Sequence, residues 1–278
     1  MNDRDVLEEV LAAEEEAERD EPDEEVGDQP AGVPEEEADP DARIGLDDPD
    51  EALLEPPEGT KAGEFISVGK LLGVPLFYER ENPGPRSFPV ARGFVPILER
   101  SVKQVRERAP ADFGELKRIV SGGMFVVKPG MHGIGKACDW DRVVFKNVEI
   151  APIERAHESS SLKTRRRYWA LGAILRSNAC FVLHGKFDAP HGDHFHQDHS
   201  IGVGFNRQHS TVTLTQAVLN DIWDASPKLA VDGDFGEKTA AALAKVLQRI
   251  GLPNDVDNAK VWQRFLRRSG RLGFRLSV

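Results

Sequence analysis

Histidine and aspartate residues gather in two motifs of this 278-residue chain. The first reads His132-x-x-Gly135-x-Ala137-x-Asp139, and the second, further along, reads His191-Gly192-Asp193-His194-Phe195-His196. Imidazole nitrogens and carboxylate oxygens are ligands that Zn²⁺ prefers, and a catalytic zinc takes three protein ligands and leaves a fourth position for water. The two motifs therefore predict a metallohydrolase.

The spacing of the first motif suits two ligands of one ion. Gly133 and Gly135 allow a tight backbone bend between His132 and Asp139. A short loop followed by a strand can then direct both side chains into one cleft. A third ligand is expected from a distant strand.

The second motif supplies that ligand and candidate catalytic groups. In a strand, His194 and His196 point to one face and Phe195 to the other, so one imidazole can bind metal while its neighbour contacts substrate. Hydrolysis also needs a proton acceptor and a donor for the developing oxyanion. Asp193, three residues before His196, is expected to be the acceptor, and His191 the donor.

The two cysteines, Cys138 and Cys180, are too few for a disulfide framework. Cys138 adjoins Asp139 and could compete for the metal, although a small buried side chain is the favoured interpretation. A disulfide between the two cysteines stays open.

Charge divides the chain into two unlike parts. The first sixty residues hold 25 acidic side chains, three arginines and no lysine, a net charge of −22, so the remainder carries +11. Residues 1–61 are rich in Glu, Asp and Pro and are predicted to be a disordered acidic tail. Val6, Leu7, Val10 and Leu11 nevertheless have helical spacing and could form one short helix. The tail either solvates the chain or masks the basic body.

Residues 62–208 read as one α+β domain. Helical spacing is expected over 95–105 and over the arginine-rich stretch 165–176. Residues 113–119 form a second pattern that ends in a turn at Ser121-Gly122-Gly123, followed by a strand-like run at 124–127. Further strands are expected in the regions 137–150, 181–183 and 194–203.

Residues 213–278 form a compact three-helix unit. Helices are expected from Thr213, over 237–250 and over 260–268, with a turn at Val231-Asp232-Gly233-Asp234-Phe235-Gly236. This turn is similar to a calcium loop, but the bidentate glutamate at the twelfth loop position is missing.

Several classes of protein are disfavoured. No run of about 18 apolar residues is present, so no membrane span is expected. The N-terminus is acidic where a secretory signal is basic and then apolar, so work outside a cell would need another route of release. The basic run 163–167 beside Tyr168 and Trp169 could suggest nucleic-acid binding, but at helical spacing the aromatic rings are expected to face the core.

The first motif together with Asp193-x-x-His196 resembles the zinc D-Ala-D-Ala carboxypeptidases and the hedgehog-like metallopeptidase fold. More narrowly, residues 178–183 (Asn-Ala-Cys-Phe-Val-Leu) followed by His191-x-Asp193-His194-Phe195-His196-x-Asp198 resemble the extensin-like C-terminal domain family of bacteria. The resemblance covers residues 90–205. The 231–239 region is similar to peptidoglycan-binding-like domains.

The resemblance implies a zinc peptidase acting on peptidoglycan stem peptides at the bacterial cell wall, held there by the C-terminal unit. It implies His132, Asp139 and His196 as ligands. The same resemblance makes Asp193 the base, His191 the transition-state histidine and His194 a histidine near the metal.

The chain departs from the family at one place. Relatives carry a Cys-Arg pair before the first motif where this chain has residues 125–128, so the substrate-gripping arginine of the family is missing there, and Lys128 is a candidate substitute. Lysine offers a point charge without the bidentate fork of arginine. The alternative function is therefore a non-catalytic, zinc-containing wall-binding, virion or adhesion protein.

Overall fold

The computed structural model describes residues 3–20, 65–127, 130–199 and 202–277, and it has the mixed α+β composition that the sequence predicts. Its helices are α1 (Asp3–Asp20), α2 (Val95–Arg108), α3 (Leu162–Arg176), α4 (His209–Asp221), α5 (Glu237–Arg249) and α6 (Ala259–Arg275). Its strands are β1 (Phe65–Val68), β2 (Lys70–Leu71), β3 (Val74–Tyr78), β4 (Gly84–Pro85), β5 (Phe88–Ala91), β6 (Leu116–Gly123), β7 (Ala137–Phe145), β8 (Glu149–Ile150), β9 (Phe181–Leu183) and β10 (Phe195–Asp198).

The main sheet runs in the order β2-β3-β6-β7-β10-β9, with β4 paired to β3 and β8 to β7. Neighbouring strands are antiparallel except for β3 and β6, which are parallel. β1 and β5 form a separate two-stranded ribbon. The two histidine motifs therefore meet where β7 pairs with β10, inside the sheet.

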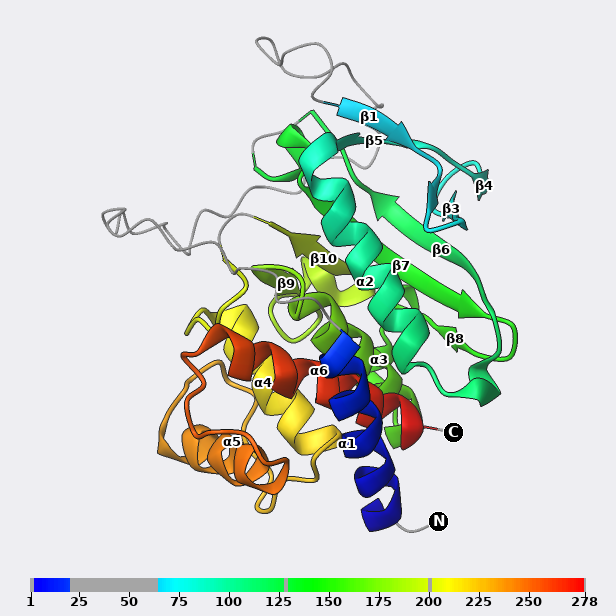
Figure 1. Ribbon diagram of the computed structural model, residues 1–278. Coiled ribbons are helices and arrows are strands. Elements are labelled where there is room, and N and C mark those ends of the chain that lie inside the picture. The colour runs from blue at the N-terminus through cyan, green and yellow to red at the C-terminus, as the bar shows by residue number, and fades with distance from the viewer. Residues whose placement is uncertain (1–2, 21–64, 128–129, 200–201, 278) are drawn as a thin grey trace.

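Helices α2 and α3 cover one face of this sheet (Figure 1). Gln197 of β10 points to that face, where its amide nitrogen donates to Ser101 Oγ at 2.9 Å and to the Leu175 carbonyl at 3.1 Å, and its amide oxygen accepts from Trp140 Nε1 at 3.0 Å. Because strand side chains alternate, the neighbours of Gln197 and Trp140 point to the opposite face. The histidines and aspartates of the two motifs lie on that opposite face.

The three C-terminal helices share a core with the sheet domain. α6 packs along α3, and Gly270 and Gly273 permit this close approach, since a Cβ at Gly270 would lie 2.4 Å from Ile174 and one at Gly273 would lie 2.9 Å from Ala170. The buried apolar residues of both parts belong to one cluster. The predicted boundary before residue 213 lies near the start of α4, but the region 213–278 packs directly onto the 62–208 region.

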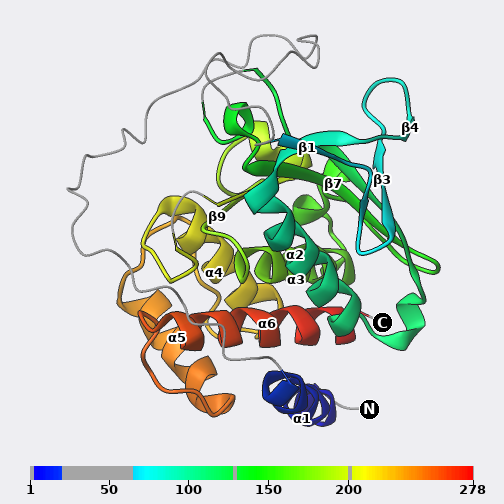
Figure 2. The same ribbon diagram turned by 45° about the horizontal axis from the view of Figure 1, so that its top comes forward.

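The prediction of a disordered tail is wrong for residues 3–20. They form α1, which packs on α6 on the side away from α3 and contacts the C-terminal end of α2 (Figure 2). Val6, Leu7 and Val10 are buried there, because their spacing gives the helix one apolar stripe. The rest of the predicted tail, 21–61, lies outside the described residues.

The other elements agree with the sequence except at β6. The helices expected at 95–105 and 165–176 are present as α2 and α3, and 181–183 is β9. Ser121, Gly122 and Gly123, predicted to be a turn, are the end of strand β6, and 124–127 is not a strand. Glycines in a sequence indicate a turn, but here Gly122 leaves room for the side chain of Arg80, which follows β3.

The basic run 163–167 does not form an open cationic surface. Tyr168 and Trp169 are buried, as predicted. Arg165 pairs with the Asp221 carboxylate at 2.9 Å, Arg166 donates to the Asp221 carbonyl, and Arg167 donates to the Ser277 carbonyl. These arginines attach α3 to α4 and to the end of the chain.

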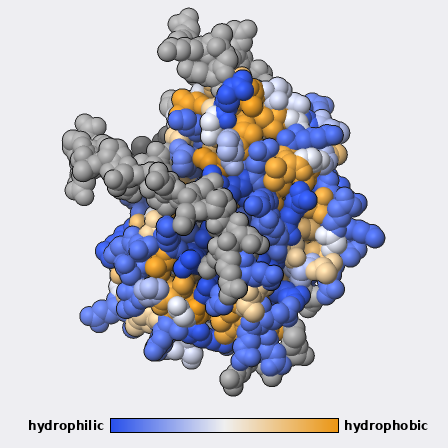
Figure 3. Space-filling view, viewed as in Figure 1, coloured by the Kyte–Doolittle hydropathy of each residue, from blue (hydrophilic) through white to orange (hydrophobic). Residues whose placement is uncertain are grey.

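The visible surface in Figure 3 is mostly hydrophilic, with apolar residues in separate groups. Across the described part of the chain, every helix is too short or too polar to cross a bilayer. Cys138 and Cys180 are both buried and have no disulfide between them. Cys138 alternates with Asp139 along β7 and pairs with Gln197, so its side chain lies on the helix-covered face, away from Asp139. Burial there raises the pKa of the Cys138 thiol well above its ordinary value.

Candidate metal centre

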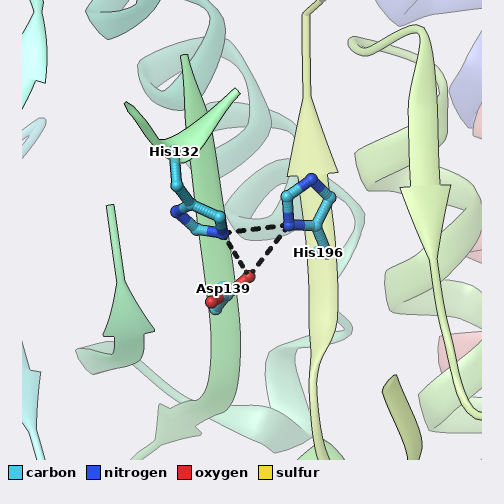
Figure 4. A group of neighbouring side chains, drawn as sticks. All are labelled: His132, Asp139 and His196. Atoms are coloured by element: carbon cyan, nitrogen blue, oxygen red, sulfur yellow. Dashed lines mark hydrogen bonds and ion pairs between the residues drawn. The ribbon is translucent and has the colours of Figure 1, made fainter. Parts of the chain in front are cut away.

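Three side-chain atoms form a small triangle on the face of the sheet opposite α2 and α3 (Figure 4). Nε2 of His132 lies 3.2 Å from Oδ1 of Asp139 and 3.1 Å from Nδ1 of His196, and that Nδ1 lies 3.2 Å from the same Asp139 oxygen. Only 6%, 19% and 11% of the three side chains, in that order, are exposed. The structure thus brings together all three predicted ligands.

Two strands and one short turn hold these ligands. Asp139 and His196 are direct cross-strand partners in the β7–β10 ladder, which places their side chains side by side. His132 comes from a short 3-10 turn, His132–Ile134, that ends at Gly135 in the left-handed region, with φ of 66°. The backbone carbonyl of Gly135 accepts the Ala91 N–H at 3.0 Å, which ties the turn to β5.

A side chain at position 135 would collide with its surroundings. A Cβ there would lie 2.4 Å from the Phe65 ring and 2.8 Å from the Ala91 nitrogen. The predicted need for glycine in this bend is therefore confirmed at Gly135, on both conformational and steric grounds.

Outer hydrogen bonds orient both imidazoles. Nδ1 of His132 lies 3.4 Å from the Met124 carbonyl, and Nε2 of His196 lies 3.3 Å from the Asp198 carboxylate. Each of these acceptors requires the facing ring nitrogen to carry the proton. The other nitrogen of each neutral ring then presents its lone pair to the triangle, as in histidines that bind metals.

The triangle fits a cation by distance and by charge. Ligands about 2.0–2.1 Å from a tetrahedral zinc lie about 3.3 Å from one another, close to the separations observed here. With the ring protons directed outward, two lone pairs and a carboxylate oxygen face each other without a proton between them. This group can hold a metal ion.

The pKa values of Asp139 and His196 also indicate that the metal-free cluster lacks positive charge. Burial alone would raise the pKa of Asp139, but His132 and His194 hold it well below its ordinary value. Burial alone would lower the pKa of His196, but hydrogen bonds to Asp139 and Asp198 raise it to about 9. The pocket therefore attracts a proton when no metal is bound.

The predicted catalytic residues His194 and Asp193 lie beside the triangle and contact each other. Nδ1 of His194 donates to Oδ1 of Asp193 at 2.7 Å, and Nε2 of His194 lies 3.6 Å from Oδ1 of Asp139. His194 therefore shares the face of His196, as alternation predicts. The hydrogen bond from His194 and the charge of Arg80 lower the pKa of Asp193, although partial burial opposes them.

His191 belongs to a second carboxylate–imidazole pair. Its Nδ1 lies 2.5 Å from Oδ1 of Asp188, which also accepts the His191 backbone N–H at 2.9 Å. The His191 ring centre lies 5.8 Å from that of His196. Burial lowers the pKa of His191 despite the neighbouring Asp188. His191 is thus neutral at neutral pH, with Nδ1–H donating to Asp188 and Nε2 as an acceptor.

Arg80 and Asp141 are site residues that sequence reasoning missed. Arg80 follows β3 and donates to both oxygens of Asp141, at 2.8 Å and 3.0 Å, while its Nη2 lies 3.4 Å from Oδ2 of Asp193. The Asp141 side chain is fully buried, and its hydrogen bonds hold the pKa of Arg80 above the ordinary value. The available signal was the Asp139-x-Asp141 spacing, which places both carboxylates on one face of a strand.

Gly122 makes the path of Arg80 possible. A Cβ at position 122 would lie 2.8 Å from Oδ1 of Asp141 and 2.9 Å from Nε of Arg80. The guanidinium therefore crosses β6 where that strand has no side chain, and it reaches Asp141 on β7. Lys128, the residue expected to replace the family arginine, lies outside the described residues.

Comparison with protein-family models, with curated proteins and with solved structures found no match for this chain. The resemblance to zinc peptidases therefore rests on the two motifs, and the case for a metal centre rests on their geometry.

Proposed function

We propose that this protein is a zinc-dependent hydrolase that cleaves peptide bonds in peptidoglycan stem peptides, as a carboxypeptidase or an endopeptidase. One observation carries the proposal: Nε2 of His132, Nδ1 of His196 and Oδ1 of Asp139 lie 3.1–3.2 Å from one another, and each ring has an acceptor at its other nitrogen. Three ligands of this type, with a fourth position left for water, are typical of catalytic zinc rather than of closed structural zinc sites.

A bound zinc ion would polarise a carbonyl and lower the pKa of water. The chain itself must supply proton transfer and positioning. His194 faces the Asp139 oxygen through Nε2 and is anchored by Asp193 through Nδ1, so its ring has a fixed direction beside the metal position. Arg80 fixes the other Asp193 oxygen.

Asp193 and His191 compete for the role of proton acceptor. Asp193 is the residue expected from the motif, but its two oxygens contact His194 and Arg80, and its lowered pKa makes it a weaker base. His191 is neutral, and Asp188 holds its Nδ1 so that Nε2 can accept a proton. We retain Asp193 as the base and assign His191 to the oxyanion, toward which its Nε2 can donate only after it has taken up a proton. The following comparison tests the exchange of these roles.

The wall-binding part of the proposal rests on the turn at 231–236. The Gln216 side chain organises this turn: its oxygen accepts the N–H groups of Asp232 and Gly233 at 3.0 Å, and its nitrogen donates to the Asp232 carboxylate at 2.8 Å. Gly233 has φ of 77°, as a tight turn requires. We propose that this region holds the enzyme on the wall, where the basic body favours contact with anionic polymers.

The first test is metal content by elemental analysis, followed by digestion of purified peptidoglycan with mass spectrometry of the released fragments. Wild type should carry about one zinc per chain, and His196→Ala should lose both metal and cleavage. His209→Gln is the matched control, because His209 is exposed and is not one of the three ligands. A metal-replete wild type without zinc would refute the proposal.

The role of the base is tested by Asp193→Asn and His191→Gln, with zinc content measured in each variant. Both should keep the metal. If Asp193 is the base, Asp193→Asn should lose about 10²- to 10⁴-fold in turnover and the acidic limb of the pH profile. Full hydrolysis by Asp193→Asn, with loss in His191→Gln, would assign the base to His191.

A second candidate is a zinc-containing wall-binding protein without turnover. The observation that favours it is the engagement of both Asp193 oxygens, which leaves the expected base constrained. Full zinc occupancy and binding to insoluble wall, with no cleavage of any wall fragment, would support this candidate over the hydrolase.

A further inference from the structure

Helix α1 lies in a groove formed by the C-terminal end of α2 and by α6. We name this surface the α2/α6 groove and define it by residues 108–111 together with Arg271 and Arg275. We propose that the α2/α6 groove is a docking site for an acidic amphipathic helix of a partner protein, and that α1 is the removable occupant that this partner displaces. This inference does not depend on the proposed hydrolase activity.

A buried glutamate anchors α1 in the groove. Oε2 of Glu14 lies 3.0 Å from Nη2 of Arg108, and its Oε1 lies 2.6 Å from Nε of Arg271. The side chains of Glu14 and Arg108 are 0% and 1% exposed. Burying a carboxylate costs much less free energy when oppositely charged groups pair with it. The groove therefore selects a helix that carries a carboxylate at this position.

The remaining contacts define the rest of the recognised pattern. Val6, Val10 and Glu14 lie four residues apart, on one stripe of the helix, with Leu7 beside them. Glu9 pairs with Arg275 at the edge of the groove. The fitting partner is thus a helix with apolar residues at two successive i, i+4 positions, a glutamate at the third, and acidic residues along its margin.

The fit of α1 is incomplete at one edge, although its Val6, Leu7 and Val10 join the core. A pocket of about 270 Å³, partly open to solvent, remains between Glu9, Val10 and Ala13 of α1 and the groove. Protein cores are close-packed, so a hollow in this interface means lost contacts and weaker docking. A helix with a larger side chain at the position of Ala13 would fill the cavity and bind more tightly than α1 does.

The chain connection permits release. The packing of α1 is concentrated on α6, on the side away from α3, so the sheet and the α3 core remain covered when α1 leaves. Residues 21–64 connect α1 to β1. Because α1 and the groove belong to one chain, rebinding of α1 is intramolecular, so a separate partner helix must bind more strongly than α1 to displace it.

The test uses the full chain with a protease recognition sequence inserted between residues 21 and 64, cleaved after purification. A fluorescent peptide of residues 3–20 is added, and exchange with the resident α1 fragment is followed by anisotropy. The cleaved chain should bind the peptide, and the uncleaved chain should bind it at least about 10-fold more weakly because its own α1 is tethered.

Three peptide variants identify the recognised features without altering the folded body. Glu14→Gln should bind at least about 10-fold more weakly. Glu15→Gln, which removes the same charge from an exposed position, should bind like the wild-type peptide. Ala13→Leu should bind more tightly. Equal binding of the Glu14→Gln and Glu15→Gln peptides, or loss of helical circular dichroism from the body when the fragment leaves, would overturn the proposal.

Discussion

Two clusters of buried ionisable side chains differ in how their charges are balanced. In the α2/α6 groove, Glu14 contacts Arg108 and Arg271, and Glu107 also lies 3.9 Å from Arg108, so the charges compensate within the protein. On the other face of the sheet, His132, Asp139 and His196 surround one point without a fixed cation, and the raised pKa of His196 shows that this cluster attracts a positive charge. Similar distances therefore describe a closed ion pair in one place and an incomplete site in the other. Charge balance, rather than proximity, identifies the cluster that needs a cation.

The largest expected effect tests whether the second cluster is incomplete. Zinc in about 1,000-fold excess over its dissociation constant should stabilise wild type by about 4 kcal/mol, which is a rise in melting temperature of roughly 10 °C. His196→Ala should show no rise. Calorimetry with and without chelator checks this, with His209→Gln expected to respond like wild type. Equal melting temperatures of wild-type protein with and without zinc would contradict it.

The opposite behaviour is expected from the compensated cluster. Glu14→Gln leaves Arg108 and Arg271 without their shared carboxylate, at a cost of about 3 kcal/mol, so α1 amides should exchange hydrogen about 100-fold faster. Amides of β7 and β10 should not change, and zinc should not restore protection. Hydrogen exchange with mass spectrometry measures both regions at once, and unchanged α1 protection would show that the ion pair contributes little.

Arg80 connects an internal ion pair to the metal face. Arg80→Gln should retain zinc but reduce turnover about 10- to 100-fold, because Asp193 loses one of its two partners. Arg92→Gln removes an exposed arginine and serves as the control. Loss of zinc from Arg80→Gln would mean that Arg80 supports the ligands themselves rather than Asp193.

A smaller effect is expected from the glycine beneath Arg80. Gly122→Ala forces the Arg80–Asp141 pair to shift, so turnover should fall several-fold and stability by about 1 kcal/mol. Gly123→Ala is a matched control in the same strand, since a Cβ there meets no atom within 4 Å. Equal turnover in the two variants would show that the position of Arg80 does not affect the reaction rate.

The smallest effect concerns His157, a buried imidazole that belongs to neither cluster. Burial lowers its pKa to about 4 from the ordinary 6.5. The unfolded chain therefore binds a proton that the folded chain rejects, and stability falls as the pH drops through the window from 6.5 to 4. Between pH 7 and pH 6 this loss is about 0.7 kcal/mol. Urea unfolding should show a smaller loss in His157→Gln, and an identical loss would exclude His157 as the cause.

The sequence brought His132 and Asp139 together because a glycine bend and strand alternation act over a few residues. It also predicted a third ligand from a distant strand, and the family resemblance implied that this ligand is His196; all three converge in the structure. Arg80 could not be found in this way, because its contact with Asp141 spans 61 residues and depends on the pairing of β3 with β6. Gly122 and Gly123 were misread for the same reason: the purpose of a glycine in a strand depends on what passes over it.

The acidic tail shows the limit of composition as a guide. Residues 3–20 share the acidity of the segment that follows, yet they form a docked helix. The apolar spacing of Val6 and Val10 indicated a helix, but the burial of Glu14 depends on Arg271, which is 257 residues away. The average charge of a segment predicts that its side chains stay in water, whereas one ion-pair partner can bury a single charged residue of that segment.

The side chain of Gln197 has a consequence for how the site exchanges its ion. This residue separates His196 from Asp198, and it is bonded to α2, to α3 and to β7 on the covered face of the sheet. The strand that carries the ligand is thus fixed by contacts that no ion helps to form. After a chelator has removed the ion, the protein should therefore keep its metal site assembled. Rebinding should be limited only by diffusion and dehydration of the ion, without a refolding phase.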